Sequence, residues 1–124
     1  MMQKRWVMFA GILGAIGVAI GAFGAHGLED LLIENGRLDT FETANRYHMY
    51  HVLALLAVAW LSDRYPVRLV NIAGWAFVAG IVLFSGSLYV LAILNIGIMG
   101  AIAPIGGAAL IIGWLCVAGV TLKD

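Results

Sequence analysis

Charge is scarce in this sequence, and that scarcity excludes most classes of soluble protein. Only 11% of the 124 residues are charged, whereas 63% are hydrophobic. A soluble domain is about half apolar and about a quarter charged, so this chain has too few polar residues to cover a surface that faces water. The 7 basic and 7 acidic residues cancel to a formal net charge of zero, so no basic field indicates a nucleic-acid partner. We expect a single-domain protein whose main partner is the lipid bilayer.

The sequence also lacks the motifs of common catalytic and metal centres. The lone cysteine, Cys116, cannot form a disulfide within the chain, and its apolar neighbours favour a packed thiol. There is no phosphate-binding loop and no H-E-x-x-H zinc motif. Ser85, Gly86 and Ser87 lie inside an apolar run rather than at the strand-to-helix turn that a nucleophile elbow requires. We therefore predict a protein that is not an enzyme and that holds no cofactor and no metal.

Long apolar runs, by contrast, occupy most of the chain. A membrane-spanning helix needs about 20 mostly apolar residues. Four such spans are predicted, at about 6–25, 44–61, 69–94 and 99–122. An outer amphipathic segment, 28–43, precedes the second span, where Asp39 and Glu42 resemble a capping box at the start of a helix. The predicted fold is all-α, an integral membrane bundle of four transmembrane helices with up-down topology.

Lysine and arginine set the predicted orientation. One end of the predicted bundle carries Lys4, Arg5, Arg64, Arg68 and Lys123. At the opposite end Arg37 and Arg46 are outnumbered by acidic residues. The positive-inside rule then places both termini in the cytoplasm, as in an N-in/C-in multi-pass protein of the inner (plasma) membrane.

The first apolar run also resembles a secretory signal peptide. Lys4 and Arg5 would form its basic start, and the residues Ala22, Phe23 and Gly24 would pass as a cleavage site. The run is long for the apolar region of a signal peptide, however. We expect this segment to remain in the protein as its first span.

Glycines mark the face on which the first predicted helix would pack. Gly14, Gly17, Gly21 and Gly24 recur at steps of three and four, so they lie on one stripe of a helix. Small residues let helix backbones approach each other closely in lipid. We interpret the stripe as a packing surface, and a groove for a lipid or another ligand is the alternative.

The fourth predicted span contains a helix-bending element. Pro104 removes one backbone hydrogen bond, and Gly106 and Gly107 follow it closely. In lipid the freed carbonyl must find another partner. We interpret these residues as a kink that serves packing, and a hinge or a polar pocket lined by backbone is the alternative.

Several motifs, taken together, resemble a known family. They are GAFGAHG at 21–27, YHMYH at 47–51, LFSGSLYVLAI at 83–93, APIGG at 103–107, and Gly113 with Trp114. In this order and over nearly the whole chain they resemble the YgdD-like family of small, uncharacterised inner-membrane proteins with four predicted spans. The resemblance implies no activity. The chain departs from the family pattern at His48, where the family has glutamine, and at Ala103, where it often has threonine.

The polar residues of the predicted spans gather in the half of the bundle far from the termini. They are His26, His48, His51, Ser85, Ser87 and Tyr89. One interpretation is a set of interfacial hydrogen bonds, in which His51 bonds Ser85 or Tyr89 across helices. A second is a zinc or copper site formed by the three histidines. A third is a proton relay or transport site, although no span carries a carboxylate at mid-membrane.

The composition and the missing motifs together predict a function. We expect a small non-enzymatic membrane protein that serves as an accessory or assembly subunit, with a membrane-protein partner or with itself. The alternative is a small oligomeric channel or transporter with a polar site in the outer half of the bundle. The two hypotheses differ in whether His51, Ser85 and Tyr89 face a water-filled cavity or a dry helix contact.

Overall fold

The computed structural model describes the backbone of residues 2–123 and the side chains of residues 4–122. Every regular element in this part of the chain is helical, and no strand occurs in it. The elements are α1 (Met2–His26), α2 (Glu29–Glu34), α3 (Leu38–Arg64), α4 (Arg68–Gly80), η1 (Ile81–Ser85), α5 (Gly86–Leu94), α6 (Met99–Val120) and η2 (Thr121–Lys123). The all-helical class predicted from the sequence is therefore confirmed.

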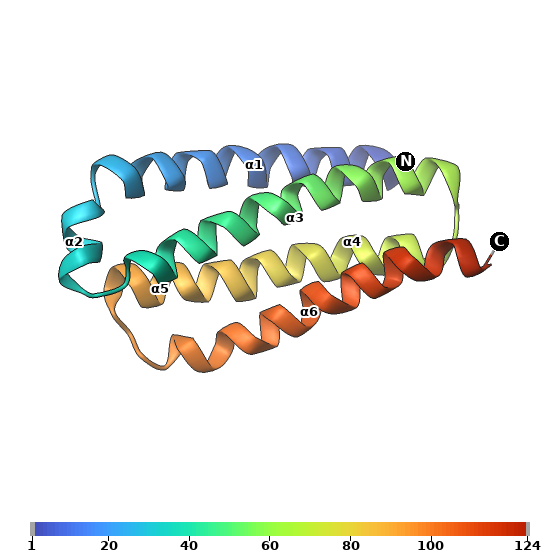
Figure 1. The fold of residues 1–124 in the computed structure, drawn as a ribbon. Helices are drawn as coiled ribbons and strands as arrows, with labels where there is room; N and C mark the ends of the chain where they lie inside the picture. Colours follow the sequence, from blue (N-terminus) through green and yellow to red (C-terminus); the bar gives the residue numbers. More distant parts are fainter. Residues whose placement is uncertain (1, 124) are drawn as a thin grey trace.

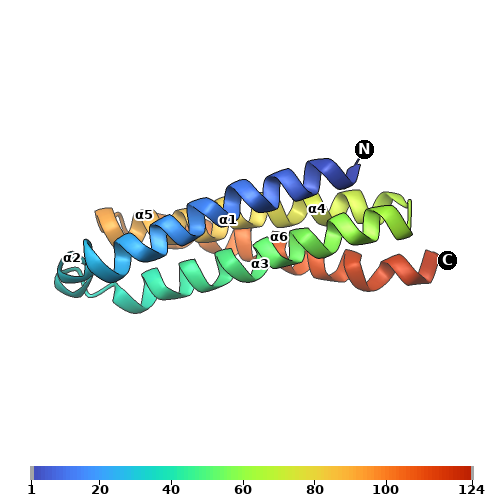
Figure 2. The same cartoon turned by 90° about the horizontal axis from the view of Figure 1, so that it is seen from above.

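The long helices lie side by side along one axis (Figure 1). α4, η1 and α5 follow one another without a break and form a single rod, Arg68–Leu94. The start of α1 and the end of α6 lie at one end of the molecule, and α2 lies at the other, as a second view also shows (Figure 2). The polar linker between α1 and α3 is thus separated from both ends of the chain by the full length of the helices.

Among the described residues, three helical segments are long and apolar enough to cross a membrane: Lys4–His26, Arg68–Leu94 and Met99–Val120. The span predicted at 44–61 lies within α3, which is not one of these three. α3 has 27 residues, so its length suffices, but Asp39, Glu42 and Arg46 make its first half polar. Hydropathy therefore supports three spans, whereas the sequence analysis expected four.

Two clusters of apolar side chains fill the interior. The larger lies toward the end with the chain termini and includes Trp6, Leu55 and Phe77, all fully buried. The smaller lies at the α2 end, where Leu32 packs with Phe41 and others. At the α2 end, burial of apolar side chains is favourable because it removes them from water. Within lipid, close packing holds the helices together instead.

The connections at the α2 end differ in detail from the sequence prediction. α3 begins at Leu38 after Arg37, and no side chain caps it, because Asp39 already lies in its first turn. The amphipathic segment expected at 28–43 is divided, since α2 ends at Glu34 and Gly36 takes a left-handed φ of 67°. Also at the α2 end, α5 terminates at Asn95, which has a left-handed φ of 55° and starts the turn into α6.

Asn35 fastens this linker to the end of the neighbouring helix. Its side-chain amide nitrogen donates to the carbonyl oxygens of Ala92, at 3.0 Å, and Ile93, at 3.3 Å. The last carbonyls of a helix have no partner within the helix. Asn35 thus supplies α5 with a cap and joins α2 to the rod.

Candidate functional site

His48 joins three helices through both of its ring nitrogens. Nε2 lies 2.8 Å from the carbonyl oxygen of Leu13 on α1, and Nδ1 lies 2.8 Å from the hydroxyl of Tyr89 on α5. A carbonyl oxygen only accepts, so Nε2 must carry the hydrogen. Nδ1 then accepts a hydrogen bond from the Tyr89 hydroxyl. This arrangement assigns the neutral imidazole one tautomer and leaves neither nitrogen free.

Asn45 extends the same network. Its amide nitrogen donates to the Gly17 carbonyl at 2.9 Å and to the Tyr89 hydroxyl at 3.2 Å. Asn45 and His48 lie three residues apart on α3, so they occupy one face of that helix. The result is a continuous chain of donors and acceptors from Asn45 through Tyr89 and His48 to the backbone of α1.

The glycine stripe of α1 lies directly under this network. A Cβ atom added to Gly17 would come within 3.0 Å of His48 Nε2, and one added to Gly21 would come within 2.8 Å of Asn45 Oδ1. The absence of side chains at these positions lets the α3 side chains reach backbone carbonyls of α1. Gly14 and Gly24 make room for apolar side chains of α3, those of Val52 and Phe41 respectively.

His51 makes a separate connection, to α6. Its Nδ1 donates to the Tyr47 carbonyl one turn earlier, at 2.6 Å, and its Nε2 accepts from the indole N–H of Trp114 at 2.9 Å. The expected bonds from His51 to Ser85 or Tyr89 do not form. The same three-residue spacing separates Asn45, His48 and His51 along α3. The first two nevertheless bond to α1 and α5, whereas His51 bonds to α6, so spacing alone does not decide the partner helix.

The two serines of the rod differ in what they bind. Ser85 is fully buried and its hydroxyl donates to the Ala44 carbonyl of α3 at 2.7 Å. The Ser87 hydroxyl donates to the Phe84 carbonyl, one turn earlier in the same rod, at 3.0 Å. Ser85 ends the π-helical segment η1, and such single-turn bulges often occur where a helix is adapted to a special contact.

The special contact at η1 is with Gly106. A Cβ atom on Gly106 would lie 2.6 Å from the Leu83 carbonyl carbon and 2.7 Å from the Phe84 Cα, so the two backbones touch. Gly107 faces the Phe84 ring with ordinary clearance. Pro104 is exposed, and α6 continues past it as one helix. Gly106 therefore belongs to the helix contact, whereas Gly107 also borders an open cavity between α6 and α3.

The histidines do not converge. His26 is exposed at the end of α1, whereas His48 and His51 are buried in the two separate contacts described above. Within the searched part of the chain, no three His, Cys, Asp or Glu side chains lie close enough to hold a metal ion. The geometry of the side chains thus disfavours the metal-site interpretation.

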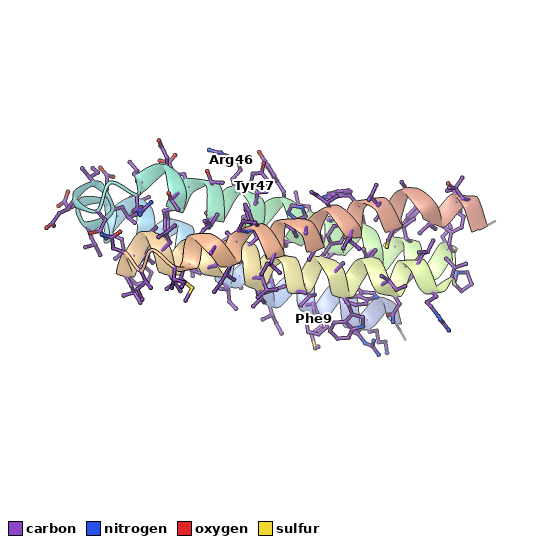
Figure 3. The ribbon with its side chains drawn as sticks, turned by 90° about the horizontal axis from the view of Figure 1, so that it is seen from below. Phe9, Arg46 and Tyr47 are labelled. Atoms are coloured by element: carbon purple, nitrogen blue, oxygen red, sulfur yellow. The ribbon has the colours of Figure 1, made fainter. Side chains whose placement is uncertain are left out.

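An open cavity of about 770 Å³ lies between α3 and α6. Aromatic side chains line much of it: Tyr47, Tyr50, Phe84 and Trp114. Tyr47 and its neighbour Arg46 lie on the same side of the molecule, whereas Phe9 emerges from α1 at another part of the surface (Figure 3). The Tyr47 ring packs against the Phe84 ring, with 5.3 Å between their centroids. His51 borders this cavity, but its Nε2 is occupied by Trp114. We refer to this cavity as the α3–α6 groove.

Sequence analysis missed two members of these networks, Asn45 and Trp114. Asn45 carries a detectable signal, because it is an amide inside a predicted span and lies three residues before His48. Trp114 carries no such signal, because tryptophan is common in apolar helices and its N–H finds His51 only through packing.

Comparison with known proteins identifies relatives over nearly the whole chain. A family described as protein of unknown function (DUF423) matches residues 20–107. The UPF0382 membrane protein YwdK of Bacillus subtilis is 46% identical over 122 residues, 98% of each chain. A UPF0382 membrane protein of Staphylococcus epidermidis is 46% identical over 121 residues, again 98% of each chain. No solved structure matches significantly. These findings support an uncharacterised family of membrane proteins, under these designations rather than the YgdD name.

Proposed function

We propose a function for this protein from the premise that it belongs to the DUF423 family and that its relatives in Bacillus and Staphylococcus are named as membrane proteins. We propose that it is a multi-pass protein of the inner membrane that serves as a non-enzymatic accessory or assembly subunit of a larger membrane complex. The proposal has three parts, which are the number of spans, their orientation and the role of the polar network.

α3 is the fourth span in this proposal. It lies antiparallel to α1, with Phe41 beside Gly24 at one end and Val52 beside Gly14 further along. A helix that packs along a spanning helix must share its depth in the bilayer. The polar side chains of α3 are compatible with this, since His48 and His51 are bonded inside the bundle and Arg46 is long enough to extend toward the headgroups.

The orientation follows from the basic residues near the ends of the helices. Arg5, Arg64 and Arg68 lie at the end of the bundle that holds the chain termini, whereas α2 at the other end begins with acidic residues. The positive-inside rule favours a cytoplasmic position for the first end. Both termini are then in the cytoplasm, and α2 is outside.

The observation that carries the functional proposal is the hydrogen bonding of the polar network. Tyr89, His48 and Ser85 bond to one another or to backbone carbonyls of neighbouring helices. His51 borders the α3–α6 groove, but both of its ring nitrogens are bonded within the bundle. A channel or transporter would need such groups to contact water or a passing ion. In this bundle they instead fix the relative positions of α1, α3 and the rod, which is the task of a structural scaffold.

The α3–α6 groove is the surface that a partner helix would use in this proposal. The test is photo-crosslinking in the native membrane, with a photoreactive residue at Ile111 in the groove and, as a matched control, at Val82 on the exposed side of η1. We expect a discrete crosslinked protein band from Ile111, with the same mass increment found by native mass spectrometry after gentle extraction.

The same experiment is able to contradict the proposal. Equal crosslinking at Ile111 and Val82 would indicate random collisions in the membrane. A monomer with no co-purifying protein in native mass spectrometry would exclude an accessory subunit of a stable complex.

A further inference from the structure

A second cavity, of about 500 Å³, lies where α1 ends and α3 begins. We refer to it as the α1–α3 pocket. Its walls come from the last turns of α1, the first residue of α2 and the first turns of α3. The polar side chains that line it are Glu29, Glu42, Asn45 and Arg46. The pocket is thus a mixed polar site at the α2 end of the bundle.

The charges around this pocket have both signs and are not paired. Glu42 and Arg46 lie one helical turn apart on α3, a spacing that allows an ion pair. Within the described side chains, 4–122, no carboxylate lies within ion-pair distance of a basic group. Two carboxylates and one guanidinium therefore face the same 500 Å³ space, each available to a ligand.

Asn45 adds an acceptor to this set. Its amide nitrogen is used twice inside the bundle, by the Gly17 carbonyl and by the Tyr89 hydroxyl. These two bonds fix the orientation of the amide and leave Oδ1 on the side of Gly21, which lines the pocket. An ammonium group with several N–H donors would find an amide oxygen and two carboxylates here.

An exposed apolar strip continues from the pocket along α3. Leu53, Leu56 and Trp60 follow Arg46 at spacings that keep them on its side of the helix. Leu53 also lies at the edge of the α3–α6 groove. Their side chains are 63%, 46% and 58% exposed, respectively. The strip leads from the charged pocket toward the other end of the bundle. The pocket and the strip are thus arranged like the headgroup and the acyl chain of a lipid.

We propose that the α1–α3 pocket binds a zwitterionic phospholipid whose headgroup carries a primary ammonium, that is, a phosphoethanolamine headgroup. Arg46 binds the phosphate, Glu42 and Glu29 bind the ammonium together with Asn45 Oδ1, and an acyl chain lies along the strip of Leu53, Leu56 and Trp60. This site goes beyond the accessory role proposed above, and it does not depend on the presence of a protein partner.

The chemistry of the pocket predicts an order of preference among lipids. A phosphoglycerol headgroup offers the phosphate but no cation for the two carboxylates. A phosphocholine headgroup offers a cation without N–H donors, so it cannot form the hydrogen bonds to carboxylate oxygens. We expect phosphatidylethanolamine to bind most tightly, phosphatidylcholine less and phosphatidylglycerol least.

The test is native mass spectrometry of the full-length protein, titrated with these three lipids with identical acyl chains. We expect Glu42→Gln to weaken phosphatidylethanolamine binding about tenfold and to leave phosphatidylglycerol binding unchanged or stronger, because one charge-assisted bond is lost. Arg46→Gln should weaken the binding of all three lipids, because each of them carries the phosphate that Arg46 binds. Glu29→Gln provides a second variant on the opposite wall of the pocket.

Matched controls carry the same chemical change outside the pocket. Glu34→Gln on α2 and Arg64→Gln at the end of α3 should leave all three affinities as in the unmodified protein. Equal binding of the three lipids to the unmodified protein would overturn the proposal. So would an equal loss in Glu34→Gln and Glu42→Gln, because the effect would then come from surface charge alone.

Discussion

At the scale of single residues, the main finding is that most buried polar side chains have partners, whereas the buried Trp6 Nε1 and Asn71 Oδ1 have none within the described part of the chain. His48 uses both ring nitrogens, and the Tyr89 hydroxyl both accepts from Asn45 and donates to His48. An unpaired polar group would cost several kcal/mol in hydrocarbon, on the order of 2–7 kcal/mol. The position of each of these residues is therefore explained by a neighbour on another helix.

The bond between His48 and Tyr89 can be measured by a double-mutant cycle. We expect His48→Leu and Tyr89→Phe each to lower the free energy of unfolding in detergent or bicelles. Their coupling should be about 0.6 kcal/mol and at most about 1.7 kcal/mol, the range for hydrogen bonds between membrane helices. A coupling near zero would indicate that the bond does not contribute.

A control for this cycle lies on the same helix. Tyr50 is exposed, and no hydrogen bond of its hydroxyl is found in the structure. A cycle of His48→Leu with Tyr50→Phe should therefore give no coupling, which separates the specific bond from the loss of any tyrosine hydroxyl.

At the scale of helices, glycines determine which pairs of elements approach most closely. On α1 they make room for donors from α3, as the contacts of Gly17 and Gly21 show. On α6, Gly106 allows contact with the backbone of η1, where the rod forms its π-helical turn. Each contact needs a glycine on one helix. The other helix contributes a side-chain donor, as on α3, or a closely approaching backbone, as at η1.

Gly106 and Gly107 provide a matched pair for testing the second contact. We expect Gly106→Ala to lower the free energy of unfolding by about 1–3 kcal/mol or more, because its Cβ would meet the backbone at Leu83 and Phe84, which cannot rotate away. Gly107→Ala should have little effect, since its Cβ would lie 3.5 Å from the Phe84 ring. Thermal unfolding in detergent measures both. Equal losses would mean that the effect does not depend on the contact of Gly106 with Leu83 and Phe84, since helix propensity favours alanine at both positions.

At the scale of the whole molecule, the arrangement places α2 and the chain termini at opposite ends (Figures 1 and 2). A membrane around such a bundle would separate the two ends. Single cysteines can test this, in a background where Cys116 is replaced by alanine. We expect Glu34→Cys on α2 to react with a membrane-impermeant maleimide in intact cells, and Leu122→Cys, which is 86% exposed, to react only after the membrane is permeabilised.

Two labelling outcomes would contradict the predicted orientation. Labelling of both cysteines in intact cells would contradict a common cytoplasmic location for the termini. The reverse pattern, with Leu122→Cys labelled first, would mean that the bundle is inverted and that the positive-inside rule fails here.

Sequence-based prediction succeeded where composition and helical period decide the outcome. The all-helical class and the membrane character follow from long apolar runs, and both are confirmed. It was less successful for α3, because the polar residues that bind other helices also lower its hydropathy. It assigned His51 the wrong partners, because one helical period cannot say which of two neighbouring helices a side chain faces.

The sequence alone therefore determined that this chain forms apolar helices and that its polar residues and glycines cluster on particular faces. Only the tertiary structure decided which faces meet. The bond of His48 to Tyr89, the contact of Gly106 with η1 and the assembly of the α1–α3 pocket all join residues far apart in the chain. The physical reason is that spacing along a helix fixes a residue's face and depth, whereas its partner depends on how the other helices pack around it.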